Sequence, residues 1–368
     1  MASSAAKTIC LLPGDGIGPE VLVPAVEVFV QAAYFAGFEY TLLRGDIGGD
    51  ALERAGVPLT DETVEMCRAS DAVLLGAVGD PRWDSNPPHL RPEMGLLKIR
   101  KELGLYANLR PVRPMPCLLD CSPLKPEIVS GIDFVVVREL AGGLYYGEPR
   151  GITGEPGEET AFNTMVCCRN EVERIAKTAF QLARRRRKRV TSVDKADYLE
   201  VGRLWRRVVE EVAQGYPDVE LSHQYVDNCA MQMVLRPAQF DVVLAENTFG
   251  GIMGDIGGML TGSIATLPSA SVGDGPCLYA PVHGSAPHLA GKNQANPAGA
   301  IGCVAMMFET SFARPDISAA IRRAVEYVLQ QGRRTGDLSR VGGEPAHADA
   351  FAQLVQERLS TELEAVVP

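Results

Sequence analysis

Three arginines and a tyrosine in the first half of the chain could bind and protonate a small acid. Arg100 ends the segment LLKIR, Arg110 lies in YANLRP, and Arg138 lies in FVVVREL, with Tyr145 shortly after it. An arginine at the end of an apolar run is costly unless an anion fixes it. Each guanidinium can also hold a carboxylate through two parallel hydrogen bonds. We therefore predict a pocket for a molecule with more than one carboxylate, although for any one arginine alone a structural salt bridge is the simpler interpretation.

A lysine and two aspartates further along the chain extend this chemistry. Lys195 follows a strand-like segment in SVDKAD, and a lysine in a water-poor site can have its pKa lowered enough to act as a base. An exposed structural lysine is the alternative. Asp227 in QYVDNCAM and Asp255 in NTFGGIMGD could hold a hard cation, Mg²⁺ or Mn²⁺, beside a bound acid. Aspartates also cap helices and form turns, so a structural role is the alternative interpretation for each of the two.

The segment PVHGSAPHLAGKNQANP at 281–297 is a long loop of small residues that contains His283, Ser285 and Asn296. Backbone amides in such a loop can approach a nucleotide closely, and a simple long turn is the alternative. GDGIG at 14–18 has the spacing G-x-G-x-G, and no acidic residue ends a second strand at the distance that a dinucleotide fingerprint requires. We interpret it as a tight turn between a strand and a helix.

The composition excludes several classes of protein. The chain has 368 residues, enough for two domains, and a net charge of −10. That charge argues against a nucleic-acid-binding surface, and the basic run 184–189 fits the C-terminus of a helix. Nine scattered cysteines without paired CxxC motifs predict reduced thiols. The N-terminus lacks the features of a signal peptide, and we expect no membrane-spanning segment and a cytoplasmic location.

The hydrophobic pattern predicts an α/β fold with a mostly parallel sheet. Residues 8–12, 71–78 and 240–247 are continuous apolar strands, and a helical pattern follows the first of them at 21–36. Apolar strands that alternate with amphipathic helices are typical of parallel sheets flanked by helices. The polar, turn-rich stretch 151–168 is expected to form an arm or hairpin.

Taken in order, several segments over residues 8–310 resemble the 3-isopropylmalate dehydrogenase family of β-decarboxylating dehydrogenases, relatives of isocitrate and tartrate dehydrogenases. They are LLPGDGIGPEV, AVLLGAVGDP, RPEMGLLKIRKELGLYANLRP, VVVRELAGGLYYGEPRG, SVDKA, YPDVELSHQYVD, LTGSIATLPSAS and PVHGSAPHLAGK. The resemblance implies a homodimer with shared active sites and the two-domain fold of this family, not a Rossmann fold. Residues 1–106 with 262–368 would form the large domain, which holds both termini and the nucleotide loop. Residues 107–261 would form the second domain, with the dimer interface and the arm.

The resemblance also implies a role for each site residue. Arg100, Arg110 and Arg138 would bind the malate carboxylates, Lys195 from the partner subunit would be the base for the 2-hydroxyl, and Tyr145 would protonate the enol after CO₂ leaves. Asp227, also from the partner, and Asp255 would bind the metal. The positions that face the 3-substituent would be Glu93, Leu96, Leu97 and Tyr198, where the leucines favour an alkyl group. NAD or NADP would contact Ile17, His283, Gly284, Ser285, Ala286, His288 and Asn296.

Four departures from the family pattern accompany these matches. Gly251 stands where the family has a metal-binding aspartate, and Ala280 stands where it has a glutamate near the nicotinamide. Asp197 and Tyr198 replace an asparagine and a small branched residue, and His288 replaces the aspartate that takes the NAD ribose hydroxyls. All four lie at metal, cofactor or substituent positions, whereas the acid-binding residues are intact.

We therefore consider three hypotheses. The first is NAD(P)-dependent oxidative decarboxylation of a 3-alkyl malate. The second is a non-redox isomerase or lyase that acts on an unsaturated or keto dicarboxylate in the same pocket, without metal or nicotinamide. The third is a non-catalytic, ligand-binding subunit, against which the retained Lys195 and Tyr145 count. The family pattern places the dehydrogenase first.

Overall fold

The computed structural model describes residues 6–339 and 345–366, and the chain divides into two compact units. The first unit comprises Met1–Leu105, Pro114–Pro126 and Gly258–Pro368, and the second comprises Tyr106–Arg113 and Glu127–Gly257. The division predicted from sequence placed 114–126 in the second domain, whereas the structure groups this segment with the first unit. One reason is Arg334, whose guanidinium donates to Asp120 Oδ2 at 2.9 Å.

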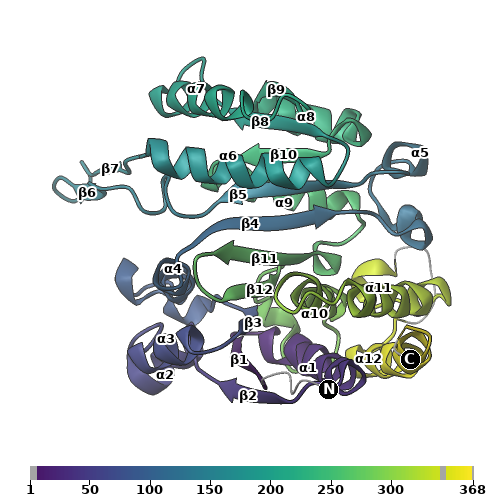
Figure 1. The fold of residues 1–368 in the computed structure, drawn as a ribbon. Helices are drawn as coiled ribbons and strands as arrows, with labels where there is room; N and C mark the ends of the chain where they lie inside the picture. The colour runs from purple at the N-terminus through teal and green to yellow at the C-terminus, as the bar shows by residue number, and fades with distance from the viewer. Residues whose placement is uncertain (1–5, 340–344, 367–368) are drawn as a thin grey trace. The chain divides into compact units, whose positions relative to one another are not determined.

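The sheet of the first unit is mostly parallel (Figure 1). Its strand order is β2-β1-β3-β12-β11, and within this order only β11 and β12 pair in the antiparallel direction. Every residue of the central β3 is buried, as expected for a strand covered on both faces. The strands are β1 (Lys7–Gly14), β2 (Tyr40–Arg44), β3 (Ala72–Ala77), β11 (Pro268–Gly273) and β12 (Cys277–Pro281).

Helices α1 and α10 pack on this sheet, and α11 and α12 pack against them. The α-helices of the unit are α1 (Gly18–Ala36), α2 (Gly49–Ala55), α3 (Asp61–Arg68), α4 (Glu93–Glu102), α10 (Ala298–Thr310), α11 (Pro315–Gln330) and α12 (Ala348–Glu364). Short 3₁₀ helices are η1 (Pro81–Trp83), η2 (Pro88–Leu90), η3 (Pro116–Cys121), η5 (Ile264–Thr266), η6 (Pro287–Leu289) and η7 (Gly336–Leu338).

Helix α1 differs from the expectation that no apolar segment is long enough to cross a membrane. By length and composition alone, its 19 residues with a hydropathy of 1.3 meet that requirement. Its buried residues, however, pack against α10, α12 and β3, and Figure 1 shows α1 beside α10 and α12. The apolar face of α1 is therefore part of the core of the first unit.

The long strands of the second unit lie in the order β4-β5-β10-β8-β9, and among them only β4 runs antiparallel to its neighbour β5. Helices α6 and α7 pack together over β5, β10, β8 and β9, and α8 contacts β8 and β9. The strands are β4 (Leu105–Val112), β5 (Phe134–Glu139), β8 (Arg189–Asp194), β9 (Glu220–Tyr225) and β10 (Val242–Ala245). The helices are α5 (Pro126–Val129), α6 (Arg169–Arg184), α7 (Glu200–Ala213), α8 (Val226–Leu235), η4 (Pro237–Gln239) and α9 (Asn247–Leu260).

Two features of the second unit bear on the sequence predictions. The stretch predicted as an arm or hairpin contains an exposed antiparallel pair, β6 (Gly151–Thr153) with β7 (Thr160–Phe162). The basic run 184–189 follows the end of α6 and is largely used in structural pairs. Arg186 donates to the buried Asp241 at 2.9 Å, and Arg184 contacts Asp218 at 2.7 Å. These ion pairs explain the basic run, so a polyanionic partner is not needed to account for it.

The parallel strands of the second unit bring the predicted site residues to one edge of its sheet. In the register of the sheet, Ala245 of β10 lies opposite Arg138 of β5 on one side and Val193 of β8 on the other. The carboxyl ends of β5, β8 and β10 therefore lie together, which is where open α/β sheets bind ligands. Lys195 follows directly after β8, and Glu246 follows directly after β10 and precedes Asn247.

Candidate active site

Arg110 on β4 and Arg138 on β5 form a buried cationic pair, with each residue 8% exposed. Burial, together with the positive charge of Arg138, lowers the pKa of Arg110 to about 10, and burial lowers the pKa of Arg138. Both remain protonated at neutral pH, because a guanidinium does not lose its charge in a protein. From the sequence, we expected that an arginine at the end of an apolar run would be buried at an energetic cost. In the structure, both arginines are buried in the second unit.

The two arginines differ in their partners. Arg110 Nη1 donates to Asp255 Oδ1 at 3.1 Å, and its Nε donates to Asn108 Oδ1 at 2.8 Å. Arg138 donates from Nε and Nη2 to the amide oxygen of Asn247, at 3.1 and 2.8 Å. Within the described residues, no carboxylate lies within ion-pair distance of Arg138. A buried cation with only a neutral partner is suited to an anionic ligand.

Glycines of α9 allow both arginines to lie against this helix. A Cβ on Gly250 would lie 2.7 Å from Arg138 Cγ, and a Cβ on Gly254 would lie 2.6 Å from Arg110 Nη1. At Gly251, the position of the missing aspartate, a Cβ would lie 3.3 Å from Arg138 Cζ. A side chain at position 251 would therefore begin against the Arg138 guanidinium. With glycine at this position, no carboxylate of α9 lies within ion-pair distance of Arg138 among the described residues.

Tyr145 lies on the loop that follows β5, and its side chain is 40% exposed. Its ring centroid is 5.9 Å from the guanidinium carbon of Arg138. The start of this loop is fixed by hydrogen bonds. Glu139 accepts them from the backbone N–H groups of Ala141 and Gly142 at 2.7 and 2.9 Å. The phenol is thus accessible to a ligand while its backbone is fixed.

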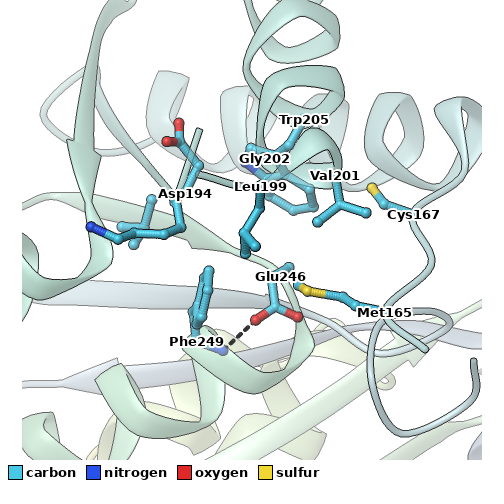
Figure 2. Close-up of a pocket in the computed structure, with 11 residues that line it drawn as sticks. Met165, Cys167, Asp194, Leu199, Val201, Gly202, Trp205, Glu246 and Phe249 are labelled. Atoms are coloured by element: carbon cyan, nitrogen blue, oxygen red, sulfur yellow. Dashed lines mark hydrogen bonds between the residues drawn. The ribbon is translucent and has the colours of Figure 1, made fainter. Parts of the chain in front are cut away.

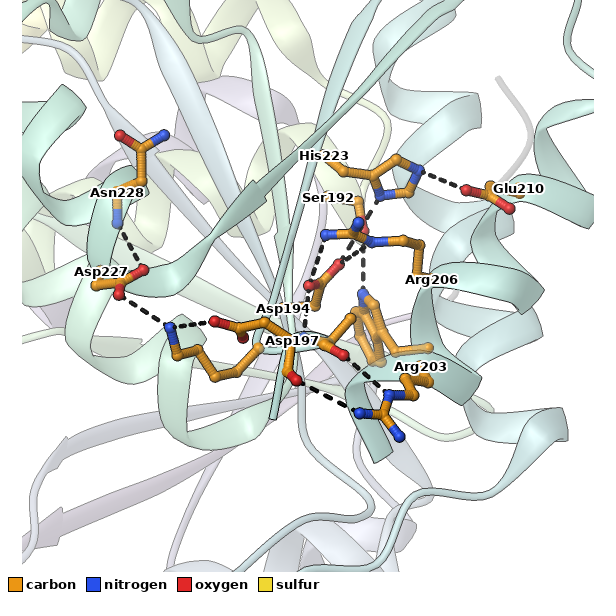
Figure 3. Close-up of polar contacts among 12 residues, drawn as sticks. Ser192, Asp194, Asp197, Arg203, Arg206, Glu210, His223, Asp227 and Asn228 are labelled. Atoms are coloured by element: carbon orange, nitrogen blue, oxygen red, sulfur yellow. Dashed lines mark hydrogen bonds and ion pairs between the residues drawn. The ribbon is translucent and has the colours of Figure 1, made fainter. Parts of the chain in front are cut away.

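Lys195 lies in a second cluster of the same unit, together with Asp197 and Asp227, which are labelled in Figure 3. Its ammonium donates to Asp227 Oδ2 at 2.9 Å and to Asp197 Oδ2 at 3.0 Å, and the rings of Tyr198 and Tyr225 each lie 5.2 Å from it. The hydrogen bonds to Asp227 and then Asp197 raise the pKa of Lys195. The sequence predicted a lowered pKa. In a single chain that prediction is wrong, because the ammonium is accessible to water and paired with two carboxylates.

The backbone beneath Lys195 is held by buried polar contacts (Figure 3). Asp194, only 2% exposed, accepts two hydrogen bonds from Arg206, both of 2.9 Å, and one from the N–H of Ala196 at 3.0 Å. His223 Nδ1 lies 3.9 Å from Asp194 Oδ2, and burial lowers the pKa of His223. The turn from β8 to Lys195 is therefore fixed by the ion pair between the buried Asp194 and the partly exposed Arg206.

A small cavity of about 20 Å³ adjoins this turn and is shown in Figure 2. It is lined by Lys195 and mostly apolar neighbours, among them Leu199, Trp205 and Phe249, with Glu246 as a buried carboxyl. A volume of this size accommodates about one water molecule, not a substrate. The cavity thus belongs to the packing around Lys195.

In the first unit, the glycine-rich turn and the predicted nucleotide loop are in direct contact. The N–H of Ile17 donates to the carbonyl of Ser285 at 2.8 Å, and Gly16, at φ +57°, leaves no room for a Cβ beside that carbonyl. His283 is 8% exposed and its Nδ1 lies 2.8 Å from the carbonyl of Gly284. Its Nε2 is buried without a hydrogen-bond partner among the described residues. Such an atom is suited to a ligand that supplies the missing partner.

The other predicted cofactor positions differ in accessibility. His288 and Gly284 are exposed, and Ala286 adopts a left-handed φ of +37°. Asn296 is buried, and its side chain donates to Asp337 Oδ2 at 3.0 Å. We therefore assign Asn296 a role in holding the loop, through Asp337, in addition to any contact with the nucleotide.

Helix α4 carries the predicted substituent residues in the first unit. Leu96, Leu97 and Arg100 are half-buried, and Glu93 is exposed at the start of the helix. A Cβ on Gly79 would lie 3.2 Å from Glu93 Oε1 and 3.3 Å from Ser285 Oγ. Glu93 and the loop at 283–288 therefore flank the same glycine, so the substituent and nucleotide positions predicted within this unit are neighbours.

Among the residues that the structure describes, the candidate metal ligands form no complete site. Asp255 is paired with Arg110 and Asp227 with Lys195, and their side chains are 62% and 64% exposed. The described residues contain no group of three or more His, Cys, Asp or Glu that could hold a metal ion. Mg²⁺ often uses only one or two protein carboxylates together with substrate oxygens and water. The exposed oxygens of Asp255 and Asp227 fit that requirement.

Three buried polar residues beside these groups were not predicted as site residues: Asn247, Asp194 and Glu246. Each comes directly at or after the end of an apolar strand, in FDVVLAEN or in VTSVD. That position was the available signal, because parallel strands gather their carboxyl ends at one edge. Their partners, such as Arg206 for Asp194, lie on other elements, and no local pattern in the sequence indicates these pairings.

Comparison with known proteins gives a consistent assignment. Residues 8–355 match the model of the family described as isocitrate/isopropylmalate dehydrogenase. The 3-isopropylmalate dehydrogenase of Geobacillus kaustophilus is 56% identical over 336 residues, which cover 91% of each chain. That of Aquifex aeolicus is 52% identical over 330 residues, 90% of this chain and 91% of the relative.

Solved structures agree with the sequence relatives. The isocitrate dehydrogenase from Methylococcus capsulatus aligns with a TM-score of 0.86 at 34% identity, over 96% of this chain and 99% of that one. A beta-decarboxylating dehydrogenase from Thermococcus kodakarensis aligns with a TM-score of 0.77 at 34% identity, over 96% of each chain. The predicted fold class and the predicted family are confirmed. The chain belongs to the isocitrate/isopropylmalate dehydrogenase family.

Proposed function

We propose that this protein catalyses the NAD-dependent oxidative decarboxylation of a 3-alkyl malate, with 3-isopropylmalate as the substrate. The observation that carries the proposal is Arg138, a buried cation whose only hydrogen-bonding partner among the described residues is an amide, next to the second buried cation Arg110. Relatives that are 49% to 56% identical are 3-isopropylmalate dehydrogenases. They do not favour the non-redox isomerase or lyase, or the non-catalytic subunit.

Each step of the proposed reaction is assigned to particular residues of this chain. Arg110 and Arg138, with Arg100, bind the two carboxylates and so fix the orientation of C2 and C3. Lys195 accepts the proton of the 2-hydroxyl when C2 is oxidised to the ketone. A nicotinamide held at the loop 283–288 would supply the acceptor for the hydride of C2, and a divalent ion held by Asp255 and Asp227 would supply positive charge that polarises the substrate. After the bond from C3 to its carboxylate breaks and CO₂ leaves, Tyr145 protonates C3 of the enol.

Lys195 needs a change of surroundings before it can act as a base. In the single chain it is paired with Asp227 and Asp197, and both hydrogen bonds favour its protonated form. We propose that assembly of a homodimer brings Lys195 and Asp227 into the site of the partner subunit, where new contacts compete for Asp227. The exposed apolar side chains of α8 and α9 support such an interface, because Met231, Leu235 and Ile252 are 65%, 60% and 50% exposed.

The proposed cofactor is NAD, bound at the loop 283–288 of the first unit, where His283 Nε2 lacks a partner among the described residues. His288 carries no negative charge that would repel a 2′-phosphate, so NADP is tested beside NAD. The proposed metal is Mg²⁺ or Mn²⁺, with Asp255 and Asp227 as its ligands. The described cysteines are free thiols, which agrees with the reducing cytoplasm that we propose as the location.

The test is a direct assay of the purified protein. With 3-isopropylmalate, NAD and Mg²⁺, we expect CO₂ and NADH to form, and the absorbance at 340 nm measures the NADH. We expect EDTA to reduce the rate of NADH formation. Malates with other 3-substituents and isocitrate show how Leu96, Leu97 and Tyr198 select the substituent. If no reduced cofactor forms with any 2-hydroxy diacid and either nucleotide, the proposal is wrong.

A further inference from the structure

Asn247 is the first residue of α9, and its side chain is almost completely buried, at 1% exposure. Its Oδ1 accepts hydrogen bonds from Arg138 Nε at 3.1 Å and from Nη2 at 2.8 Å, while its Nδ2 donates to the backbone carbonyl of Gly142 at 3.1 Å. The acceptor and donor of an asparagine share one rigid plane. A shift of this side chain therefore acts on the guanidinium and on the loop together.

The bond to Gly142 connects α9 to the loop that carries Tyr145. That loop follows β5, and the N–H of Gly143 also donates to the carbonyl of Val166 at 2.9 Å. The anchors of the loop thus include Glu139 at its start, the arm segment at Val166 and the amide of Asn247. Without the contact of Asn247, the carbonyl of Gly142 would lose the hydrogen bond that fixes its orientation.

The position of Asn247 is itself fixed by α9. The neighbouring Glu246 accepts hydrogen bonds from the N–H groups of Thr248 and Phe249 at 2.9 and 2.6 Å, which caps the first turn of the helix. Gly250 in the same turn lies directly against the side chain of Arg138. The helix, the amide and the guanidinium therefore pack together, with Asn247 buried between the other two.

We propose that Asn247 is a positioning residue, whose amide aligns Arg138 for the substrate carboxylate and at the same time fixes the loop of Tyr145. The inference rests on the proposed function, which assigns substrate binding to Arg138 and protonation to Tyr145. A neutral amide is required here. A carboxylate would pair with Arg138 and cancel the charge that the substrate meets, whereas an apolar side chain would leave buried polar groups unsatisfied.

The first test compares Asn247→Ala with wild type in steady-state kinetics on 3-isopropylmalate. We expect KM to rise and kcat to fall, each by about tenfold, because both anchored groups lose one hydrogen-bonding partner. Asn247→Asp has nearly the same shape, keeps acceptors for Arg138 and lacks the donor to Gly142, so KM should rise further. The matched control Thr191→Val loses a hydrogen bond to Ser222 in the same unit and should leave both constants unchanged.

Double-mutant cycles separate positioning from a general structural role. In an Arg138→Lys background, Asn247→Ala should raise KM by less than about threefold, and in a Tyr145→Phe background it should lower kcat by less than about threefold, because coupled residues are not additive. If Asn247→Ala does not fold, as judged by thermal melting, Asn247→Asp takes its place in both cycles. Additive effects in both cycles, or unchanged kinetics, would overturn the inference. A wild-type protein without dehydrogenase activity would instead overturn the proposed function.

Discussion

Arg206 on α7 binds the carboxylate of Asp194, the last residue of β8, through two hydrogen bonds of 2.9 Å. Asp194 is 2% exposed, so this partner and the N–H of Ala196 replace the water that the carboxylate loses on burial. The pair lies directly next to Lys195 in the sequence. Helix α7 therefore fixes the end of the strand from which the proposed base projects.

Replacement of Arg206 by methionine should destabilise the protein strongly. The change keeps much of the side-chain volume but leaves the charge of Asp194 buried without its cation, which costs about 3 to 5 kcal/mol. Urea denaturation measures the loss. Arg207→Met on the exposed face of the same helix is the control and should change stability by less than about 0.5 kcal/mol. If the double variant Asp194→Asn, Arg206→Met is no more stable than Arg206→Met alone, the buried charge is not the cause.

Glu139 should make the stability of the fold depend on pH. Burial raises the pKa of this carboxyl to about 7 from its usual 4.5, so the folded protein keeps its proton at a pH where the unfolded chain has lost it. The resulting stabilisation is complete below pH 4.5 and disappears as the pH rises through 7, by about 2 to 3 kcal/mol. Urea denaturation between pH 4 and 8 measures it.

The control for this pH dependence is a neutral side chain at the same position. Glu139→Gln should show a smaller decrease in stability over this pH range than wild type, because the glutamine does not titrate. Glu127→Gln, an exposed carboxyl of the same unit, should leave the wild-type pH dependence intact. Parallel curves for wild type and Glu139→Gln would contradict the assignment.

A methyl group at Gly254 should weaken substrate binding. Its Cβ would lie 2.6 Å from Arg110 Nη1, so the guanidinium has to move away from Asp255 and from the position in which it meets a carboxylate. We expect KM for 3-isopropylmalate to rise by about tenfold, the loss of roughly one charge-assisted hydrogen bond, with a smaller change in kcat. Gly215→Ala, where a Cβ makes only an ordinary contact of 3.5 Å with Val212 O, should behave as wild type.

Loss of the ammonium of Lys195 should affect the chemical step more than binding. Lys195→Met should lower kcat by at least about a hundredfold, the usual range for removal of a general base. Binding of 3-isopropylmalate, followed by calorimetry, should persist, because the arginines are unchanged. Lys177→Met removes an exposed lysine paired with Glu173 and should be without effect. A Lys195→Met variant with normal kcat would exclude this lysine as the base.

The elements of the fold could largely be predicted from local sequence. The apolar strands expected at 8–12, 71–78 and 240–247 correspond to β1, β3 and β10, since a strand buried on both faces shows itself as a continuous apolar run. The two buried arginines were found for a related reason, because a charge that ends such a run stands out. Residues 114–126 could not be assigned to their unit in this way, since their grouping depends on a distant residue, Arg334.

The sequence by itself determined the family, the parallel α/β architecture and the residue types that bind a dicarboxylate. Tertiary structure alone decided their partners: Asn247 rather than a carboxylate for Arg138, Arg206 for Asp194, and two aspartates for Lys195. The physical reason is that strand and helix patterns depend on neighbours in sequence. The charge state and orientation of a side chain depend instead on burial and on groups that the fold brings from distant positions.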